Sequence, residues 1–312
     1  MHNIKEIRYG DYTARINLSR GANCISLRNS KYEAEILREP DYSKELDNPY
    51  LYGMPILFPV NRISGGRFEF EGREYIFPIN EEATGCHLHG EMHNAEFEQE
   101  LYEENRIVCS YEAESEKPYF SFPHGFRIML EYVLCEEGFV HTTSITNLSG
   151  ENMPCFIGFH TTFNTLFAKG NSPENTFAFA DITEEFERNM SNYLPTGNKP
   201  EFDEISTKLS QGKLMPYSGM ISRHFRSGET GRMGIYDKGT NLSLVYENDS
   251  KYGFRLIYNG GKDGYICLEP QNCMANCANS PFGREEAGFD YIRPGETKSY
   301  TSKIYIAEGD MR

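Results

Sequence analysis

The segment FRIMLEYVL at residues 126–134 decides the class of fold, because its apolar side chains recur with a period of two. Every second side chain, from Phe126 to Leu134, is apolar or aromatic and falls on one face of a β-strand. Arg127 and Glu131 fall on the opposite face. A strand with one apolar and one partly polar face is typical of a sheet that packs against a second layer. The segment therefore predicts a β-sandwich.

The segment RFEFEGREYIF at 67–77 predicts a β-hairpin. Aromatic residues with high β-propensity flank Glu71-Gly72, and glycine readily adopts the positive φ of a tight turn. Similar strands are expected at 13–19, 22–28, 31–38, 106–112, 139–146, 233–236, 242–247, 253–258, 264–269 and 299–306. Their number and even spacing favour a large antiparallel all-β assembly over alternating βαβ units.

Helical signal is weak along the chain. The clearest candidate is DITEEFERNM at 181–190, where Asp181 is a potential N-cap and acidic residues occupy the first turn. The chain has no linker-like segment and no repeat of fixed period, and 312 residues are compatible with one large β domain. We therefore expect residues 1–312 to form a single β-sandwich domain with a few short helices. Loops are expected at 147–154, 170–175, 192–199 and 271–283.

Charge and hydropathy narrow the classes of partner. The chain has 46 Asp and Glu against 31 Lys and Arg, a formal net charge of −15, which repels nucleic acids and acidic membrane surfaces. No stretch approaches the ~18–20 apolar residues of a membrane-spanning helix, and the polar N-terminal segment lacks the apolar core of a signal peptide. We expect a cytoplasmic protein with no nucleic-acid or membrane partner.

The eight cysteines are scattered through strand-like apolar contexts, in a chain too large to need a disulfide framework. We therefore expect reduced, mostly buried thiols. Cys273 and Cys277 form a lone C-x₃-C pair, which is weak evidence for zinc without a second pair of ligands. We expect no metal site.

Several polar side chains stand inside short apolar or aromatic contexts: Asn61-Arg62, His87 and His89, His160, and Glu269. Charged groups in such contexts are costly to bury unless something pairs with them. Each alone is more often a structural histidine or an ion-paired acid than a catalyst. Together, in a sequence without Walker, G-x-G-x-x-G, H-E-x-x-H or G-x-S-x-G motifs, they suit proton transfer on an uncharged polar substrate.

Four motifs in order make the chain resemble the aldose 1-epimerase (galactose mutarotase-like) family. They are FPVNRISGGRFEFEGREY at 58–75, CHLHGEMHNAEFE at 86–98, FHTTFNTLF at 159–167 leading to YLPTG at 193–197, and ICLEPQNCMANCANSPFG at 266–283. The resemblance implies the family's large β-sandwich, the supersandwich, and an isomerase that interconverts the α and β anomers of a small-molecule sugar. It implies no cofactor.

The resemblance also implies roles for individual residues. The catalytic acid of the family matches His160, its base matches Glu269, and its sugar-binding arginine and first histidine match Arg62 and His89. In the family the acid protonates the ring oxygen of a pyranose, while the base removes the proton of the anomeric hydroxyl. A nearby carboxylate favours imidazolium, and imidazolium favours carboxylate, so we expect His160 protonated and Glu269 ionised.

Residues beside these motifs are further candidates. Asn61, next to Arg62, and Gln271, two positions after Glu269, are expected to contribute to sugar binding, and Asn164 is a possible supporting group. A structural salt bridge is the alternative for Arg62, and structural or rim roles are expected for His87 and His93. The chain is expected to act as a monomer or a homodimer.

The chain departs from the family where a sugar-binding aspartate normally follows the PTG turn. The segment GMISRHFRSGETGRM at 219–233 offers Ser222, Arg223 or His224 instead, and Asp237 is a conceivable substitute. Arg223, Arg226 and Arg232 face only Glu229 in this segment, a local excess of +2. A solvated loop is the simpler interpretation of this excess. The alternatives for function are a hexose-6-phosphate 1-epimerase, whose phosphate would dock there, and a non-catalytic carbohydrate-binding protein on the same fold.

The chain has no tryptophan among its 42 Phe and Tyr residues. The family commonly places a tryptophan after the L-H-G motif, where this chain has Phe97. Phe or Tyr must therefore support the sugar ring, and we name Phe122, Phe163 and Phe282 as candidates.

Overall fold

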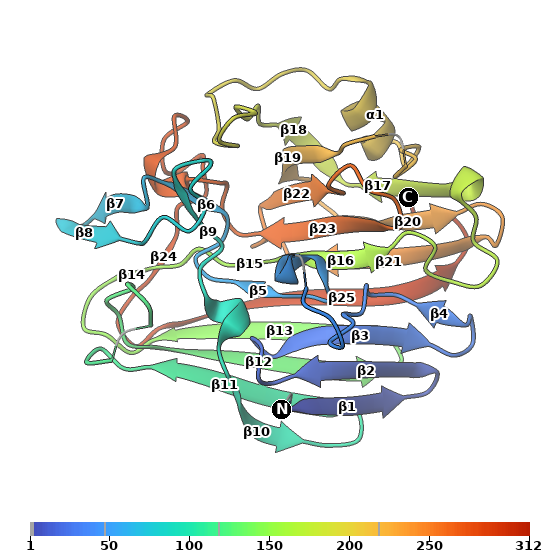
Figure 1. Cartoon of the computed structure of the whole chain (residues 1–312), viewed down its shortest axis with the longest axis horizontal. Coiled ribbons are helices and arrows are strands. Elements are labelled where there is room, and N and C mark those ends of the chain that lie inside the picture. The colour runs from blue at the N-terminus through green and yellow to red at the C-terminus, as the bar shows by residue number, and fades with distance from the viewer. Residues whose placement is uncertain (1–2, 47, 118, 218) are drawn as a thin grey trace.

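The computed structural model describes residues 3–46, 48–117, 119–217 and 219–312. Antiparallel sheets dominate it, and an eight-stranded sheet runs across the molecule behind a second, seven-stranded sheet (Figure 1). In spatial order, the eight strands are β10 (Glu98–Tyr102), β11 (Arg106–Ala113), β12 (Phe126–Cys135), β13 (Gly138–Asn147), β25 (Thr297–Glu308), β21 (Leu242–Asn248), β20 (Arg232–Asp237) and β17 (Thr176–Ala180).

The seven-stranded sheet supplies part of the wall of the cavity described below. Its strands are β18 (Ile182–Glu185), β19 (Ser222–Ser227), β22 (Phe254–Tyr258), β23 (Tyr265–Gln271), β15 (Gly158–Phe159) and β5 (Ile56–Leu57), with β16 (Thr161–Asn164) also paired to β23. Of these, β19, β22 and β23 contribute to the cavity wall. A four-stranded sheet continues this layer over β12 and consists of β1 (Ile4–Tyr9), β2 (Tyr12–Asn17), β3 (Asn23–Asn29) and β4 (Ala34–Glu35). The predicted antiparallel β-sandwich is confirmed.

Three two-stranded sheets lie at one end of the sandwich (Figure 1). They pair β6 (Arg62–Ser64) with β9 (Cys86–Leu88), β7 (Arg67–Phe70) with β8 (Arg73–Ile76), and β14 (Met153–Pro154) with β24 (Tyr291–Ile292). The predicted hairpin at 67–77 is confirmed as β7 and β8, and its turn residues Glu71 and Gly72 have φ values of 50° and 77°.

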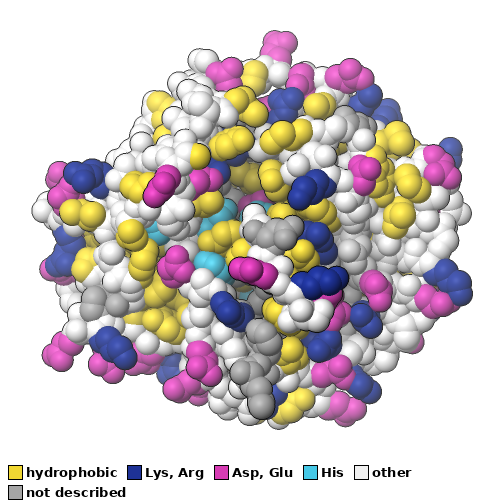
Figure 2. Space-filling view, viewed as in Figure 1, with side chains coloured by type: hydrophobic (Ala, Val, Ile, Leu, Met, Phe, Trp, Pro, Cys, Tyr) yellow, Lys and Arg dark blue, Asp and Glu magenta, His cyan; other side chains and the backbone are white. Residues whose placement is uncertain are grey.

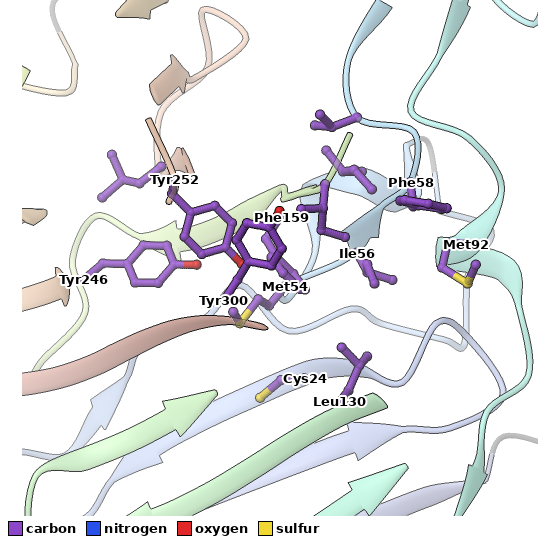
Figure 3. Close-up of a cluster of buried hydrophobic side chains, with 14 of the residues drawn as sticks. Cys24, Met54, Ile56, Phe58, Met92, Leu130, Phe159, Tyr246, Tyr252 and Tyr300 are labelled. Atoms are coloured by element: carbon purple, nitrogen blue, oxygen red, sulfur yellow. The ribbon is translucent and has the colours of Figure 1, made fainter. Parts of the chain in front are cut away.

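The core lies between the layers, where side chains from distant parts of the sequence meet (Figure 3). Cys24 of β3, Leu130 of β12, Phe159 of β15 and Tyr300 of β25 are all buried in it. The alternation predicted for 126–134 is confirmed, since every second residue from Phe126 to Leu134 is fully buried. All eight cysteines are free thiols, and all but Cys135 are buried, as expected.

The helix predicted at 181–190 is wrong. Residues 182–185 form β18, and Asp181 accepts hydrogen bonds from the backbone N–H and the hydroxyl of Thr230 instead of capping a helix. The acidic residues of this segment pair across β18 and β19, where Glu184 binds Arg226. Long-range ion pairing therefore replaces the helix-dipole interaction that suggested a helix.

The described ranges contain one α-helix, α1 (Glu204–Ser210), whose N-cap Asp203 accepts a hydrogen bond from the Ser206 N–H at 3.0 Å. The 3₁₀ helices are η1 (Pro49–Leu51), η2 (Met92–Asn94), η3 (Pro173–Asn175) and η4 (Cys277–Asn279). None of the helices in these ranges is long and apolar enough to cross a membrane. The prediction of a single domain over 1–312 stays a prediction.

Candidate active site

A cavity of about 260 Å³ opens on the face formed by the seven-stranded sheet. Figure 2 shows histidine side chains gathered at a hollow near the middle of this face. The cavity is lined by Asn48, Tyr50, Asn61, Arg62, Glu81, Leu88, His89, His160, Arg188, Tyr193, Met220, Ser222, Leu256, Tyr258 and Glu269. Five of the six site residues predicted from the sequence are among them. The sixth, Gln271, lies directly behind the cavity wall.

Strand β23 brings His160 and Glu269 together. Glu269 stands in the middle of β23, opposite Leu256 of β22. His160 lies between β15 and β16, which both pair with β23, and its N–H donates to the Pro55 carbonyl at 3.0 Å. Backbone pairing therefore places the two side chains on neighbouring strands, although 109 positions separate them in the sequence.

His160 Nε2 lies 3.2 Å from Glu269 Oε1, and both side chains are buried. The contact is close enough for an ion pair but is not aligned as a hydrogen bond. Within the described residues, Glu269 Oε1 and His160 Nδ1 are both buried without a hydrogen-bond partner. An unsatisfied buried carboxylate oxygen is costly, and a hydroxyl group entering the cavity would satisfy it.

A short chain of amides holds the other carboxylate oxygen. Gln271 Nε2 donates to Glu269 Oε2 at 3.2 Å, and Asn61 Nδ2 donates to Gln271 Oε1 at 3.0 Å. Gln271 is fully buried and faces Glu269 rather than the cavity. Its position makes it a support for Glu269, which differs from the predicted contact with sugar.

Two residues in left-handed conformation form a neighbouring part of the cavity wall. Asn61 and His89 have φ values of 62° and 63°. The His89 N–H donates to the Asn61 carbonyl at 3.0 Å, and the Asn61 N–H donates to His89 Nδ1 at 3.3 Å. This reciprocal pairing leaves His89 Nε2 as the ring nitrogen that carries the proton of the neutral imidazole.

Gly90 is required next to His89. It has φ +63°, and a Cβ there would lie 2.0 Å from the Phe58 carbonyl oxygen. Gly90→Ala should therefore destabilise the fold by about 3 kcal/mol or more, through backbone strain and a steric clash. Urea unfolding measures this against Gly72→Ala, where φ is +77° but a Cβ meets nothing within 4 Å. Equal losses in the two variants would contradict the close approach at Gly90.

Arg62 lines the cavity and is also ion-paired, so its structural salt bridge is confirmed, while its role in sugar binding stays a prediction. Its Nε and Nη2 donate to the two carboxylate oxygens of Glu81 at 2.6 and 2.7 Å. Its guanidinium lies 4.7 Å from the centroid of the Tyr193 ring. Glu81 was not predicted from the sequence, since nothing in the NEEATG segment marks it as a partner of Arg62.

The charge states expected from the sequence are wrong for the site without substrate. Burial lowers the pKa of His160 to about 4. Burial raises the pKa of Glu269 to about 8, against the opposing influence of Arg188, Gln271 and Arg62. At neutral pH the pair therefore holds one proton, and this proton is on Glu269. Desolvation outweighs the mutual attraction of the pair, and a sequence does not reveal the depth of burial.

Three tyrosines, Tyr50, Tyr193 and Tyr258, supply the aromatic surface of the cavity. The Tyr50 ring centroid lies 4.9 Å from that of His89, and the Tyr258 centroid lies 6.2 Å from that of His160. The predicted candidates are wrong, because Phe122, Phe163 and Phe282 pack in or against the core and do not line the cavity. Phe97 is likewise buried, 5.8 Å from Tyr111 between ring centroids.

In the segment 219–233, where the expected aspartate is absent, neighbouring polar residues have different positions. Ser222 lines the cavity, whereas His224 is fully buried behind it. Asp237 lies in β20 and accepts hydrogen bonds from the hydroxyls of Thr176 and Thr240, so it is not a substitute for the missing acid.

The three arginines of this segment form ion pairs. Arg223 binds Glu185 and Asp203, while the other two bind acids on neighbouring strands: Arg226 with Glu184 and Arg232 with Glu247. The local excess of positive charge is therefore neutralised by residues distant in sequence.

The remaining polar candidates lie outside the cavity. His87 Nδ1 lies 2.9 Å from the Pro78 carbonyl oxygen, and the His93 ring packs 4.5 Å from that of Tyr50. Asn164 donates to the carbonyls of Glu35 and Leu37. These contacts agree with structural roles for both histidines and remove Asn164 from the site. The described residues contain no group of three or more His, Cys, Asp or Glu side chains placed to hold a metal ion.

Comparisons with known proteins agree with this geometry. The family model for aldose 1-epimerase matches residues 7–305. A galactose mutarotase-like protein from Clostridium acetobutylicum is 30% identical, and its crystal structure has a TM-score of 0.90 over 98% of each chain. The GalM/aldose epimerase homologue from C. elegans is similar in fold, with a TM-score of 0.79 at 15% identity over 99% of this chain and 100% of that chain.

A curated relative matches a shorter region. The uncharacterized protein YphB of Escherichia coli (strain K12) is 28% identical over 109 residues, which are 35% of this chain. The match spans about a third of that relative, 36% of its length.

Proposed function

Because the chain belongs to the aldose 1-epimerase family, we propose that it interconverts the α and β anomers of a sugar through proton transfers by His160 and Glu269. The observation that carries the proposal is the buried His160–Glu269 contact of 3.2 Å at the cavity wall, with Glu269 Oε1 unsatisfied in the described structure. This arrangement offers an acid and a base on adjacent sites of one pyranose: the ring oxygen and the anomeric hydroxyl.

The reaction conserves protons over one cycle. Glu269 accepts the proton of the anomeric hydroxyl while His160 donates a proton to the ring oxygen. The bond from C1 to the ring oxygen breaks as the C1 carbonyl forms. The open-chain aldehyde then turns about C1–C2, and the reverse transfers close the ring on the other face. Since one side chain donates a proton and the other accepts one, both proton transfers are provided for, and the proposed reaction draws on no cofactor.

Substrate binding must first move the resident proton from Glu269 to His160. A sugar hydroxyl that donates to Glu269 Oε1 stabilises the carboxylate, as do the positive charges of Arg188 and Arg62. The carboxylate in turn favours imidazolium on His160. Arg62 and His89 would donate to sugar hydroxyls, and Tyr50, Tyr193 and Tyr258 would contact the ring faces.

The test is anomer exchange by the wild-type protein. Polarimetry on freshly dissolved α-D-glucose and α-D-galactose, with exchange NMR on a wider panel of aldoses, should show rates above those in buffer. Binding without exchange on any member of the panel would favour the alternative of a non-catalytic carbohydrate-binding protein.

The pH profile gives a second expected result. The one-proton form of the pair is competent, and it predominates between the two pKa values, about 4 for His160 and about 8 for Glu269. After subtraction of the buffer rate, kcat/KM should be level between these values. It should fall above pH 8, where no acid remains, and below pH 4, where no base remains. A kcat/KM that keeps rising above pH 8 would contradict the one-proton pair.

A further inference from the structure

Arg188 lies where the cavity meets a second hollow. That hollow has a volume of about 460 Å³ and shares Arg188, Met220 and Ser222 with the cavity that contains His160 and Glu269. A substituent on a sugar ring held in the cavity would therefore pass Arg188 on its way to the second hollow. The position was not predicted, since Arg188 fell within the expected helix at 181–190.

Arg188 is buried without an acidic partner. Its side chain belongs to a residue only 9% exposed, and it forms no ion pair with a carboxylate in the part of the chain that the structure describes. Its Nη2 donates to Ser222 Oγ at 2.8 Å, and its guanidinium lies 5.7 Å from the Tyr193 ring centroid. Burial lowers the pKa of Arg188 only to about 10, so it stays charged at neutral pH. A buried, unpaired cation is costly unless an anion joins it.

The acidic residues that the structure describes near Arg188 do not pair with its guanidinium. Glu81 is engaged by both donors of Arg62, and Glu185 accepts from Arg223 and from the Ser206 hydroxyl. Glu269 is the acid that faces Arg188 within the cavity, but the two groups do not reach ion-pair distance, and Glu269 holds a proton at neutral pH. The wall around Arg188 thus carries an excess of positive charge and hydrogen-bond donors.

We infer that Arg188 and Ser222 form a subsite for an anionic substituent, a carboxylate or a phosphate, on the sugar that occupies the cavity. The inference rests on the proposed function for the identity of the ligand as a sugar. A guanidinium offers two parallel N–H donors to such an anion, and the Ser222 hydroxyl, which accepts from Arg188, keeps its own proton to donate. The subsite thus differs in place from the paired arginines at 223, 226 and 232.

The test compares binding of charged and neutral sugars. Titration calorimetry with D-glucuronate, D-glucose 6-phosphate and D-glucose, and with the corresponding galactose series, should give at least tenfold tighter binding for one anionic class. A preference for the uronate identifies a carboxylate, and a preference for the 6-phosphate identifies a phosphate. Equal affinity for charged and neutral sugars, or binding of none of them, would overturn the subsite.

Substitutions of Arg188 test whether the preference for an anionic sugar depends on this residue. Arg188→Met should weaken binding of the preferred anionic sugar about 10- to 100-fold and weaken binding of the neutral sugar at least fivefold less than that, and Arg188→Lys should retain part of the preference. Arg226→Met, whose arginine pairs with Glu184 outside the cavity, should change neither. An equal loss for both sugars in Arg188→Met would show instead that Arg188 only supports Glu269.

Calorimetry measures binding without turnover, so the test of the anionic subsite is separate from the test of anomer exchange. A wild-type protein that binds anionic sugars through Arg188 but does not exchange anomers supports the subsite and overturns the proposed reaction. A wild-type protein that exchanges anomers but binds neutral and anionic sugars with equal affinity supports the proposed reaction and overturns the subsite.

Discussion

Glu269→Gln should lower kcat/KM for anomer exchange by about 10²–10⁴-fold, the usual contribution of a positioned general base. The amide keeps the shape of the carboxylate and can still accept from Gln271, which donates to Glu269 Oε2 in the wild type. It cannot take the proton of the anomeric hydroxyl. Polarimetry on the same sugars measures the loss, and Glu98→Gln, an exposed residue of β10, is the matched control. Full activity in Glu269→Gln would show that another group is the base.

The same variant should be more stable than the wild type at neutral pH. The pKa of Glu269 is raised by burial to about 8, whereas the unfolded value is ~4.3, so ionisation of the unfolded chain costs stability as pH rises through this window. Glutamine removes the cost, and we expect a gain of roughly 3–4 kcal/mol at pH 7.

The gain should depend on pH in a defined direction. It should vanish near pH 4, where both folded and unfolded states hold the proton, and reach its maximum near pH 8. Urea unfolding at several pH values measures it, with Glu98→Gln again as the control. A variant less stable than the wild type at pH 7 would contradict burial as the cause of the raised pKa.

His160→Gln should cause a loss of similar size, about 10²–10⁴-fold in kcat/KM. The variant removes the only imidazole within ion-pair distance of Glu269 in the described residues, while Arg62 and His89 still line the cavity. KM should therefore change little compared with kcat.

A buried histidine outside the cavity provides the control. His124 contacts Tyr75 and Ser149, and His124→Gln should keep the wild-type kcat even if the fold loses some stability. If His160→Gln retained the wild-type kcat, a group other than His160 would be the catalytic acid.

The fold could be predicted from short-range patterns, because alternation within one strand reports which face is buried. The segment 126–134 shows this clearly. Segment 181–190 shows the limit: its acidic residues satisfied the rules for a helix start, but partners on β19, some 40 residues away, determine its conformation. Tertiary strand pairing overrides the local helix preference of a segment, and the sequence of that segment alone does not reveal its partner strand.

The site was predictable only in part, for the same reason. Motif order identified His160, Glu269, Arg62 and His89, which the structure brings into one cavity. Tyr50 and Arg188 carry no local signal, because their place in the cavity arises from contacts with residues about 35–40 positions away, His89 for Tyr50 and Ser222 for Arg188. The pKa directions of the pair follow from depth of burial, which is a tertiary property.

The central claim is that His160 and Glu269 act as one acid–base pair, and the double variant tests it most directly. Groups that act as a unit are strongly non-additive. If each single variant loses about 10³-fold, kcat/KM of His160→Gln/Glu269→Gln, measured by exchange NMR on the best aldose substrate, should also be reduced by about 10³-fold. A reduction near 10⁶-fold, the product of the single losses, would contradict the account by showing that the two side chains contribute independently.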